Sequence, residues 1–218
     1  MWKFLSYSLT SDLSAYKNSN RIQINKEREI AHGDTCNQTT ILLPIHLGTH
    51  IDFPYHFFNK GKRGLNYSAD EFVFNNPQIV DISEYIKNDN VIEIRHFEQQ
   101  SLKLDTDFLI IKTGFCENRF DHIYYSSYPG FSDKLAFYFK QRMPSIRCIG
   151  FDLISLSSPL NGDLGKKAHI EFLKTHDILL IEDMDLRNIN LDDELSIVIA
   201  SPLRFSDSDG APVTVFYH

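Results

Sequence analysis

The chain has 218 residues, of which 42% are hydrophobic and 23% charged, and its formal net charge is −7 with histidine counted as neutral. This composition is too apolar for a disordered chain, and its length predicts a single folded domain over residues 1–218. The acidic balance, without a basic stripe, disfavours nucleic acid as a partner, and no apolar run approaches the ~18 residues that a membrane helix needs.

The cysteines and the first residues of the chain bear on its compartment. Cys36, Cys116 and Cys148 are far apart in the sequence and odd in number. Such usage indicates reduced thiols and disfavours a disulfide framework or a cysteine zinc site. Residues 1–16 carry one lysine and a short apolar patch that serines interrupt, which makes a poor secretory signal. We therefore expect a cytoplasmic protein.

Short apolar runs that are bounded by turn residues predict buried strands along the chain. These runs are rich in Ile, Val, Leu or Phe, as is typical of strands in the interior of a sheet. The predicted strands are Thr40–Leu47, Gln78–Ile82, Phe108–Lys112, Ile146–Phe151, Ile178–Glu182, Leu195–Ala200 and Pro212–Phe216.

Two helices are predicted in the second half of the chain. One runs from Ser132, a favourable capping residue, to Arg142, and Pro144 prevents its continuation. The other runs over Lys166–Thr175 with an apolar stripe on one face. Many strands with few, late helices predict an α/β fold that has a mixed β-sheet core and a few peripheral helices.

Three of the nine histidines fall within the segment from His46 to His56. If this segment is an extended strand, His46, His50 and Asp52 share one face, because residues at even separations do. A helix would bring the two histidines together but would turn Asp52 away from them. Two imidazoles and a carboxylate on one face suit Zn²⁺ or a similar divalent ion. Gly48, between them, would leave room for water or a substrate.

The segment from His46 to His56 also allows interpretations other than a catalytic metal site. Pro54 is expected to end the strand and turn the chain, so that His56 approaches the same space from the side. A lone histidine is more often an ordinary core or surface residue than a ligand. An apolar sheet domain with incidental histidines is therefore one alternative, and a metal site without catalysis is another. The cluster alone does not say what the metal does.

The segment has the pattern His-x-Gly-Thr-His-x-Asp-x-Pro-x-His, which fixes seven of eleven positions. This pattern resembles the signature of the cyclase-like metal-dependent hydrolases, a family that includes bacterial kynurenine formamidase (arylformamidase) and isatin hydrolase. Further segments are similar to motifs of that family along nearly the whole chain. They are Leu5–Leu9, Thr113–Phe115, Ile149–Asp152 with Ser155, Ile181–Leu186, Ser201–Arg204 and Asp209–Val213.

The resemblance implies a swivelling β/β/α fold, usually assembled as homodimers or homotetramers, and a centre of two divalent ions, zinc or manganese. His46, His50 and Asp52 match the ligands of the first ion, with Asp52 bridging to the second. His56 matches the catalytic histidine of the family, which is not a ligand.

The remaining ligands of the second ion match His169, on the late helix, and Glu182, on the strand that follows it. Their separation of 13 residues is one residue longer than the separation that the family pattern leads us to expect. A slip of one residue within a strand would turn the side chain to the wrong face. We expect the extra residue to be absorbed around residues 176–177, which keeps Glu182 as a ligand and leaves His176 as the lesser rival of His169.

The resemblance implies hydrolysis of a small aromatic amide, with N-formylkynurenine giving kynurenine and formate in tryptophan catabolism. A divalent ion lowers the pKa of its bound water toward ~7, and His56 could move a proton between that water and the leaving nitrogen. Hydrolysis of another cyclic amide or ester, of the isatin or lactone type, is the nearest alternative. Aromatic residues that flank the motif are candidate pocket walls: Phe53, Tyr55, Phe57 and Phe58.

Overall fold

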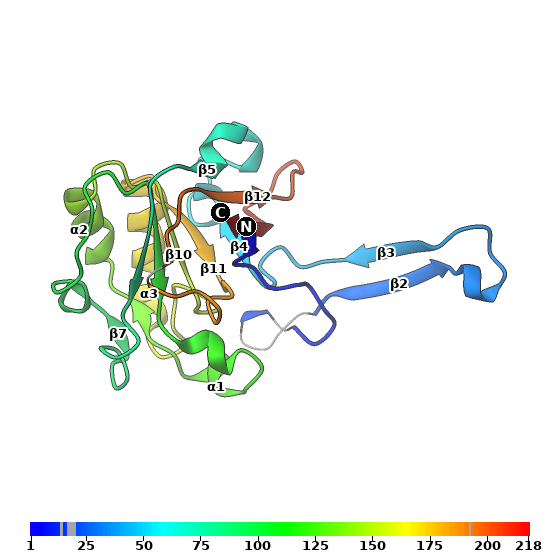
Figure 1. Ribbon diagram of the computed structural model, residues 1–218, viewed down its shortest axis with the longest axis horizontal. Helices are drawn as coiled ribbons and strands as arrows, with labels where there is room; N and C mark the ends of the chain where they lie inside the picture. The colour runs from blue at the N-terminus through cyan, green and yellow to red at the C-terminus, as the bar shows by residue number, and fades with distance from the viewer. Residues whose placement is uncertain (14, 17–20, 192) are drawn as a thin grey trace.

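The computed structural model describes residues 1–13, 15–16, 21–191 and 193–218, and within them a mixed sheet of nine strands forms the centre of the protein (Figure 1). Its strands are β1 (Lys3–Phe4), β4 (His50–Asp52), β5 (Val73–Phe74), β6 (Pro77–Asp81), β8 (Phe108–Lys112), β10 (Cys148–Phe151), β11 (Leu179–Glu182), β12 (Val198–Pro202) and β13 (Gly210–Tyr217). They follow the order β5-β12-β13-β4-β11-β10-β8-β6, and β1 pairs with β13.

Strand β4 joins a parallel half of the sheet to an antiparallel half. Strands β6, β8, β10 and β11 run parallel to one another. Strand β4 is antiparallel to both of its neighbours, β11 and β13. The register places Glu182 of β11 opposite His50 of β4. The predicted ligand-type residues therefore meet at the centre of the sheet, where both neighbouring strands hold the backbone of β4 in place.

Two apolar layers cover the two faces of the parallel strands. Successive side chains of a strand point to opposite faces, so Leu109 and Ile111 lie in one layer and Phe108 and Ile110 in the other. The first layer includes residues of the two longer helices, and the second includes residues of the antiparallel half of the sheet. The α-helices are α1 (Ile123–Ser126), α2 (Lys134–Arg142) and α3 (Gly162–Ile170).

The predicted α/β fold is confirmed, and so are most of the predicted elements. Strands occur at all the predicted places from residue 78 onward, with ends shifted by up to three residues. The first predicted helix begins two residues later, at Lys134, and the second begins four residues earlier, at Gly162. The last turn of the second helix, Glu171–Thr175, is π-helical. Element ends are the least predictable part because caps and turns compete there.

The prediction of a buried strand over residues 40–47 is wrong. Strand β3 (Gln38–Leu42) pairs with β2 (Gln23–Arg28) in a separate hairpin, and every residue of both strands is exposed. This hairpin projects far from the body of the protein (Figure 1). The strand ends at Leu42, a turn follows at residues 45–46, and Gly48 has a φ of +65° that no continuous strand accommodates.

The remaining described elements are short. Strand β7 (Val91–Ile92) pairs with β9 (Gly130–Phe131) in a small parallel sheet. The three cysteines are free, and Cys36 is exposed on the projecting hairpin whereas Cys116 and Cys148 are buried. Among the described residues, no helix has the length and apolar character to cross a membrane.

Candidate metal centre and active site

The side chains of His46, His50 and Asp52 converge, although they do not share one strand. Only residues 50–52 are extended, and His46 lies in the turn before them. The Nδ1 atom of His46 is 3.0 Å from Asp52 Oδ1, and the Nε2 atom of His50 is 3.5 Å from the same oxygen. The convergence expected from the sequence is present, but the predicted continuous strand over 46–52 is wrong.

Gly48 explains how a turn replaces the expected strand. Its backbone is left-handed, and a Cβ at this position would lie 2.7 Å from Leu9 Cδ2. The side of Gly48 that lacks a side chain therefore faces Leu9 and Leu13, and not the space between the two histidines. The glycine serves the turn that returns His46 toward Asp52, which differs from the predicted role of leaving room for water or substrate.

His169 of α3 and Glu182 at the end of β11 complete a second group around Asp52. His169 Nε2 lies 3.4 Å from Glu182 Oε1 and 3.7 Å from Asp52 Oδ2. Glu182 Oε2 in turn lies 3.3 Å from His50 Nε2. The four side chains are nearly inaccessible, with at most 4% of each exposed. Asp52 is thus shared by two groups of ligand-type atoms.

The longer spacing between His169 and Glu182 does not separate them. The π-helical turn Glu171–Thr175 is wider than an α-helical turn because its hydrogen bonds span five residues, as in the bond from His176 N to Glu171 O. Asp177, with φ of 52°, then reverses the chain into β11. His176 itself lies beside Glu171, with a ring nitrogen 3.7 Å from its carboxylate, and does not reach the two groups around Asp52.

The hydrogen bonding of Asp52, His50 and His169 shows that the site fits divalent cations. Both oxygens of Asp52 are buried and have no hydrogen-bond partner among the described residues. The Nδ1 atoms of His50 and His169 each donate to a backbone carbonyl, of Gly48 and Gly165 respectively, at 2.8 Å. In that tautomer each Nε2 presents a lone pair toward the carboxylates. Buried carboxylate oxygens that lack hydrogen bonds and lie close to imidazole nitrogens suit zinc, manganese and related ions.

The ionisation of these groups also favours a site for divalent cations. Burial lowers the pKa of His46, but the carboxylates of Asp52 and Asp209 outweigh it and raise the pKa to about 10. Burial raises the pKa of Glu182, but His169 and His50 outweigh it and hold that pKa well below its usual range. A divalent cation would compete with protons for these imidazoles and carboxylates, so binding of a cation would release protons.

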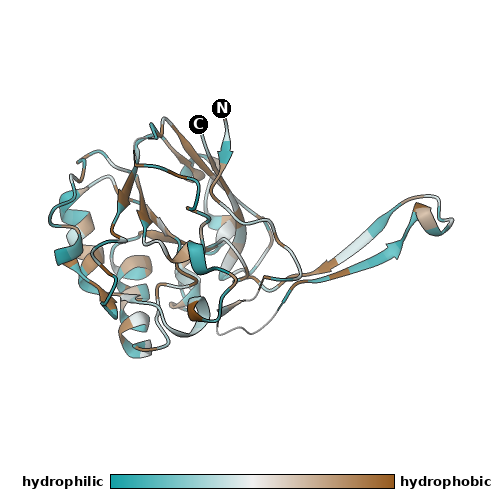
Figure 2. Ribbon diagram, turned by 60° about the horizontal axis from the view of Figure 1, so that its bottom comes forward, coloured by the Kyte–Doolittle hydropathy of each residue, from teal (hydrophilic) through white to brown (hydrophobic). Residues whose placement is uncertain are grey.

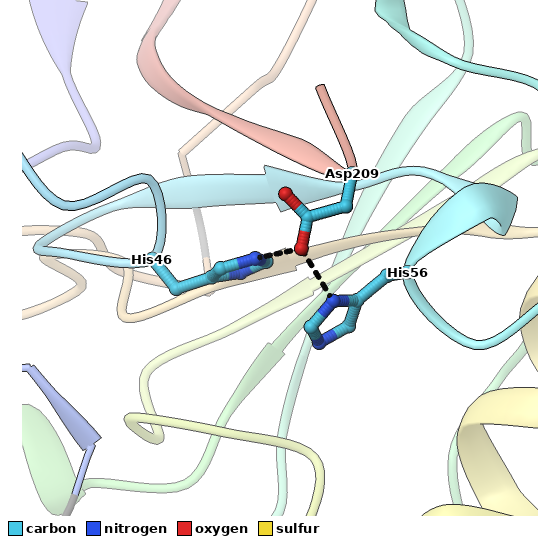
Figure 3. Close-up of side chains that lie close together, drawn as sticks. All are labelled: His46, His56 and Asp209. Carbon is cyan, nitrogen blue, oxygen red and sulfur yellow. Dashed lines mark hydrogen bonds and ion pairs between the residues drawn. The ribbon is translucent and has the colours of Figure 1, made fainter. Parts of the chain in front are cut away.

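A third group joins His56 to His46 through Asp209, the residue before β13 (Figure 3). Asp209 Oδ2 lies 2.8 Å from His56 Nδ1 and 2.9 Å from His46 Nε2. These three side chains also have ligand-type atoms within reach of one ion. The sequence interpretation gave Asp209 no role, although it opens the segment 209–213 that resembles a family motif. Gly210 follows it, and a Cβ there would lie 2.8 Å from His46 Cε1.

A cavity of about 370 Å³ is lined by four histidines and a glutamate of the site: His46, His50, His56, His169 and Glu182. Its other lining residues are Tyr16, Phe57, Ile154, Ser155, Ser157, Gly162 and Lys166. Of the predicted aromatic walls, only Phe57 lines this cavity, where its ring stacks on His169 at a centroid distance of 4.3 Å. Tyr55 and Phe58 line a neighbouring depression that also includes His56, whereas Phe53 is buried in the core.

Comparisons with known proteins find relatives that cover nearly the whole chain. Residues 5–158 match the family model described as "Putative cyclase". A kynurenine formamidase from Bacillus mycoides (strain KBAB4) is 27% identical over 215 residues, which cover 97% of this chain and 94% of that protein. Isatin hydrolase A from Labrenzia aggregata, solved with benzyl benzoate, has a TM-score of 0.80 and 18% identity, covering 100% of this chain and 93% of that one. A structure described as a potential metal-dependent hydrolase with cyclase activity has a TM-score of 0.79 and 18% identity, covering 100% and 96%.

Proposed function

Because the chain belongs to the cyclase family, whose model matches residues 5–158, we propose that it is a metal-dependent hydrolase of aryl formamides. The proposed reaction is hydrolysis of N-formylkynurenine to kynurenine and formate. The observation that carries the proposal is Asp52, whose two buried oxygens lack hydrogen bonds among the described residues and face ligand-type side chains on both sides. The kynurenine formamidases that match 97% of the chain support the choice of substrate.

Two cations are accommodated by the two groups around Asp52. His46, His50 and Asp52 would hold one ion, and Asp52, His169 and Glu182 the other. Bound divalent cations lower the pKa of water and polarise a carbonyl oxygen, which are the two activations that amide hydrolysis needs. The sharing of Asp52 keeps both activations within one small volume, next to the cavity that would receive the formyl group.

His56 is positioned to move the proton. Its Nδ1 donates to Asp209, so that Nε2 on the other side of the ring carries the lone pair. Nε2 accepts a proton as water adds to the formyl carbon, and it returns that proton to the amide nitrogen as the carbon–nitrogen bond breaks. The products are an aromatic amine and formate, so the reaction needs no protein nucleophile. Loss of an aniline nitrogen is easier than loss of an alkyl amine.

The cavity suits an aromatic substrate that also carries an anionic group. Phe57 and Tyr16 offer flat apolar surfaces for a ring. Lys166, exposed at the edge of the cavity, offers a cation for a carboxylate some distance from the formyl group. N-formylkynurenine has both features, whereas an uncharged aryl formamide has only the ring.

The decisive experiment combines elemental analysis with a substrate panel. Protein purified without added metal is expected to contain stoichiometric divalent metal, to hydrolyse N-formylkynurenine faster than isatin or a lactone, and to lose activity on exhaustive chelation. His50→Ala is expected to lose both metal and activity. Full activity after chelation would overturn metal dependence. Faster hydrolysis of isatin or a lactone would leave metal dependence standing and would replace the proposed substrate.

A further inference from the structure

The side chains of His46, His56 and Asp209, which we call the Asp209 group, are more exposed than the residues around Asp52. Figure 2 shows hydrophobic stretches along the strands of the body, and Asp52 and Glu182 lie on two strands whose residues are all buried. The side chains of His46, His56 and Asp209 are instead 26%, 28% and 37% exposed. A cation from solution can therefore reach the Asp209 group without entering the interior.

A depression of about 450 Å³ provides this access, and its charged lining residues are two aspartates, Asp207 and Asp209. Asp207 pairs with Arg63 at 3.5 Å, which leaves Asp209 as the carboxylate that a cation can bind. Asp209 lines the depression but not the larger cavity that would receive the formyl group, whereas His56 lines both. The ring of His56 is therefore shared by an acidic depression and the proposed reaction cavity.

The Asp209 group presents three ligand-type atoms to one another from three separate segments of the chain. Asp209 Oδ2 lies 2.9 Å from His46 Nε2 and 2.8 Å from His56 Nδ1 (Figure 3). The centroids of the two imidazole rings are 4.3 Å apart. Because the three ligand-type atoms all lie within 4.8 Å of one another, a single ion can contact them with small movements of the side chains.

The donor set of the Asp209 group favours zinc, and its hydrogen bonds make it a weaker site than the groups around Asp52. Imidazole nitrogens suit zinc, whereas magnesium and manganese prefer oxygen ligands. A cation bound here must replace the two hydrogen bonds that Asp209 accepts, whereas the oxygens of Asp52 accept none from the described residues. We therefore expect zinc to enter the Asp209 group last, at concentrations above those that fill the groups around Asp52.

We propose that the Asp209 group is an inhibitory site for an additional zinc ion, which binds His56 Nδ1, Asp209 and His46 Nε2. A neutral imidazole carries one ring proton, so zinc on Nδ1 of His56 places that proton on Nε2. Nε2 then has no lone pair with which to accept a proton from the attacking water, and turnover stops. The inhibition rests on the proposed function, whereas the binding of the additional ion does not.

The binding test is equilibrium dialysis of the full chain against increasing zinc, with elemental analysis, and anomalous diffraction to locate the ions. We expect one equivalent of zinc beyond those held by the two groups around Asp52, with anomalous density between His56 and Asp209. Magnesium at the same concentrations should not supply it. Asp209→Asn and His56→Ala are each expected to lose this additional equivalent. The matched control is Asp207→Asn, which removes a charge from the same depression but outside the group and should keep it.

Steady-state kinetics on the same samples test the inhibition. As the additional equivalent binds, kcat for N-formylkynurenine is expected to fall by about 10²-fold or more with KM unchanged, because the proton carrier is blocked and the cavity is not. A weak chelator that removes only the additional ion should restore kcat.

The outcomes separate the site from its effect and from the proposed reaction. Zinc binding that ends with the groups around Asp52, or an additional ion that persists in Asp209→Asn, would overturn the site. An additional ion that leaves kcat unchanged would overturn the inhibition. An additional ion located at His56 and Asp209 in a protein that hydrolyses no formamide would support the site and overturn the proposed function.

Discussion

His56 is oriented by Asp209, so its contribution can be separated from cation binding. Replacing His56 with alanine leaves the two groups around Asp52 intact but removes the proton carrier. We expect His56→Ala to retain its metal and to lose about 10²–10⁴-fold in turnover. Steady-state kinetics with elemental analysis on the same samples measure both effects. His176→Ala, at a histidine outside the site, is the control, and equal turnover in the two variants would refute the assignment of His56.

At the residue scale, the sequence predicted which ligand-type side chains lie close together. It did not predict the side chain that orients two of the histidines. His46, His50, Asp52, His169 and Glu182 come together as the motif and the resemblance implied. Asp209 was missed because it lies 153 residues from His56 in the sequence, and a lone aspartate before a glycine has no local signal of its contacts. Only the fold brings β13 beside the turn that carries His46.

At the scale of the element, a buried ion pair secures the end of β11. Asp183 follows Glu182 with a left-handed backbone, φ of 55°. Its carboxylate accepts hydrogen bonds of 2.7 Å from both Arg119 and Tyr124, and its carbonyl accepts one of 2.6 Å from Thr49, the residue before His50. Arg119 thereby supports both the strand that presents Glu182 and the strand that presents His50.

Removing Arg119 is therefore expected to be costly. Arg119→Met leaves Asp183 buried without its ionic partner, and a loss of about 3–5 kcal/mol in the free energy of unfolding is expected, as for other broken buried pairs. Urea unfolding measures it. Arg187→Met breaks a partly exposed pair with Asp185 and is expected to cost about 1 kcal/mol or less. Similar losses in the two variants would show that Arg119 is not a structural anchor.

The turn at Gly48 gives a second expectation at this scale. Gly48→Ala forces an L residue into a left-handed backbone and places its Cβ against Leu9, so a cost of about 1–2 kcal/mol is expected from the backbone alone. Displacement of the turn also moves His46, so the variant should bind metal more weakly. Gly162→Ala is the control, because a Cβ there has no neighbour within 4 Å. Thermal unfolding and metal titration compare the two, and unaltered metal affinity in Gly48→Ala would contradict the role of the turn.

The elements that the sequence predicted well are those whose apolar runs are buried. Strand β8 is found with the predicted ends because four of its five residues are buried. The segment 40–47 was predicted with the same rule and failed, since its first residues belong to an exposed hairpin and a positive φ at Gly48 leaves no trace in hydrophobic patterning. The π-helical turn was equally invisible, because a widened turn keeps the same apolar residues facing the core.

At the scale of the whole molecule, the candidate ligands tie together α3, β11, β4 and the turn before β4. Cations that bind only the folded chain are expected to stabilise it, by about 2.7 kcal/mol at a free concentration one hundred times the dissociation constant. Thermal unfolding with added manganese or zinc, and after chelation, measures the effect. The chelated protein should remain folded, because its apolar layers are complete without the site.

Asp52→Asn supplies the matched control for that measurement. The variant keeps the size of the side chain but removes the charge shared by both groups, so added metal should no longer raise its unfolding temperature. A metal-dependent increase as large as that of the unaltered protein would place the stabilising cation elsewhere.

The architecture of the whole was predictable because strands dominate the pattern and helices come late, and the resemblance specified the fold further. The direction of the projecting hairpin formed by β2 and β3 was not predictable from either source. Hydrophobic patterning assigns apolar residues to the interior of their own chain, whereas Ile24 and Ile41 lie on a ribbon that leaves the body.

Because one carboxylate, Asp52, belongs to both groups of ligand-type residues, two cations in these groups would not bind independently. In the proposed centre, an ion bound first would neutralise charge that a second ion also needs, and the two ions would repel each other at close range. Loading should consequently proceed in two unequal steps. If the centre takes two ions as proposed, molecules that carry a single ion should outnumber those that carry two when metal is scarce, so that the supply of metal in the surroundings would set the fraction of fully assembled centres.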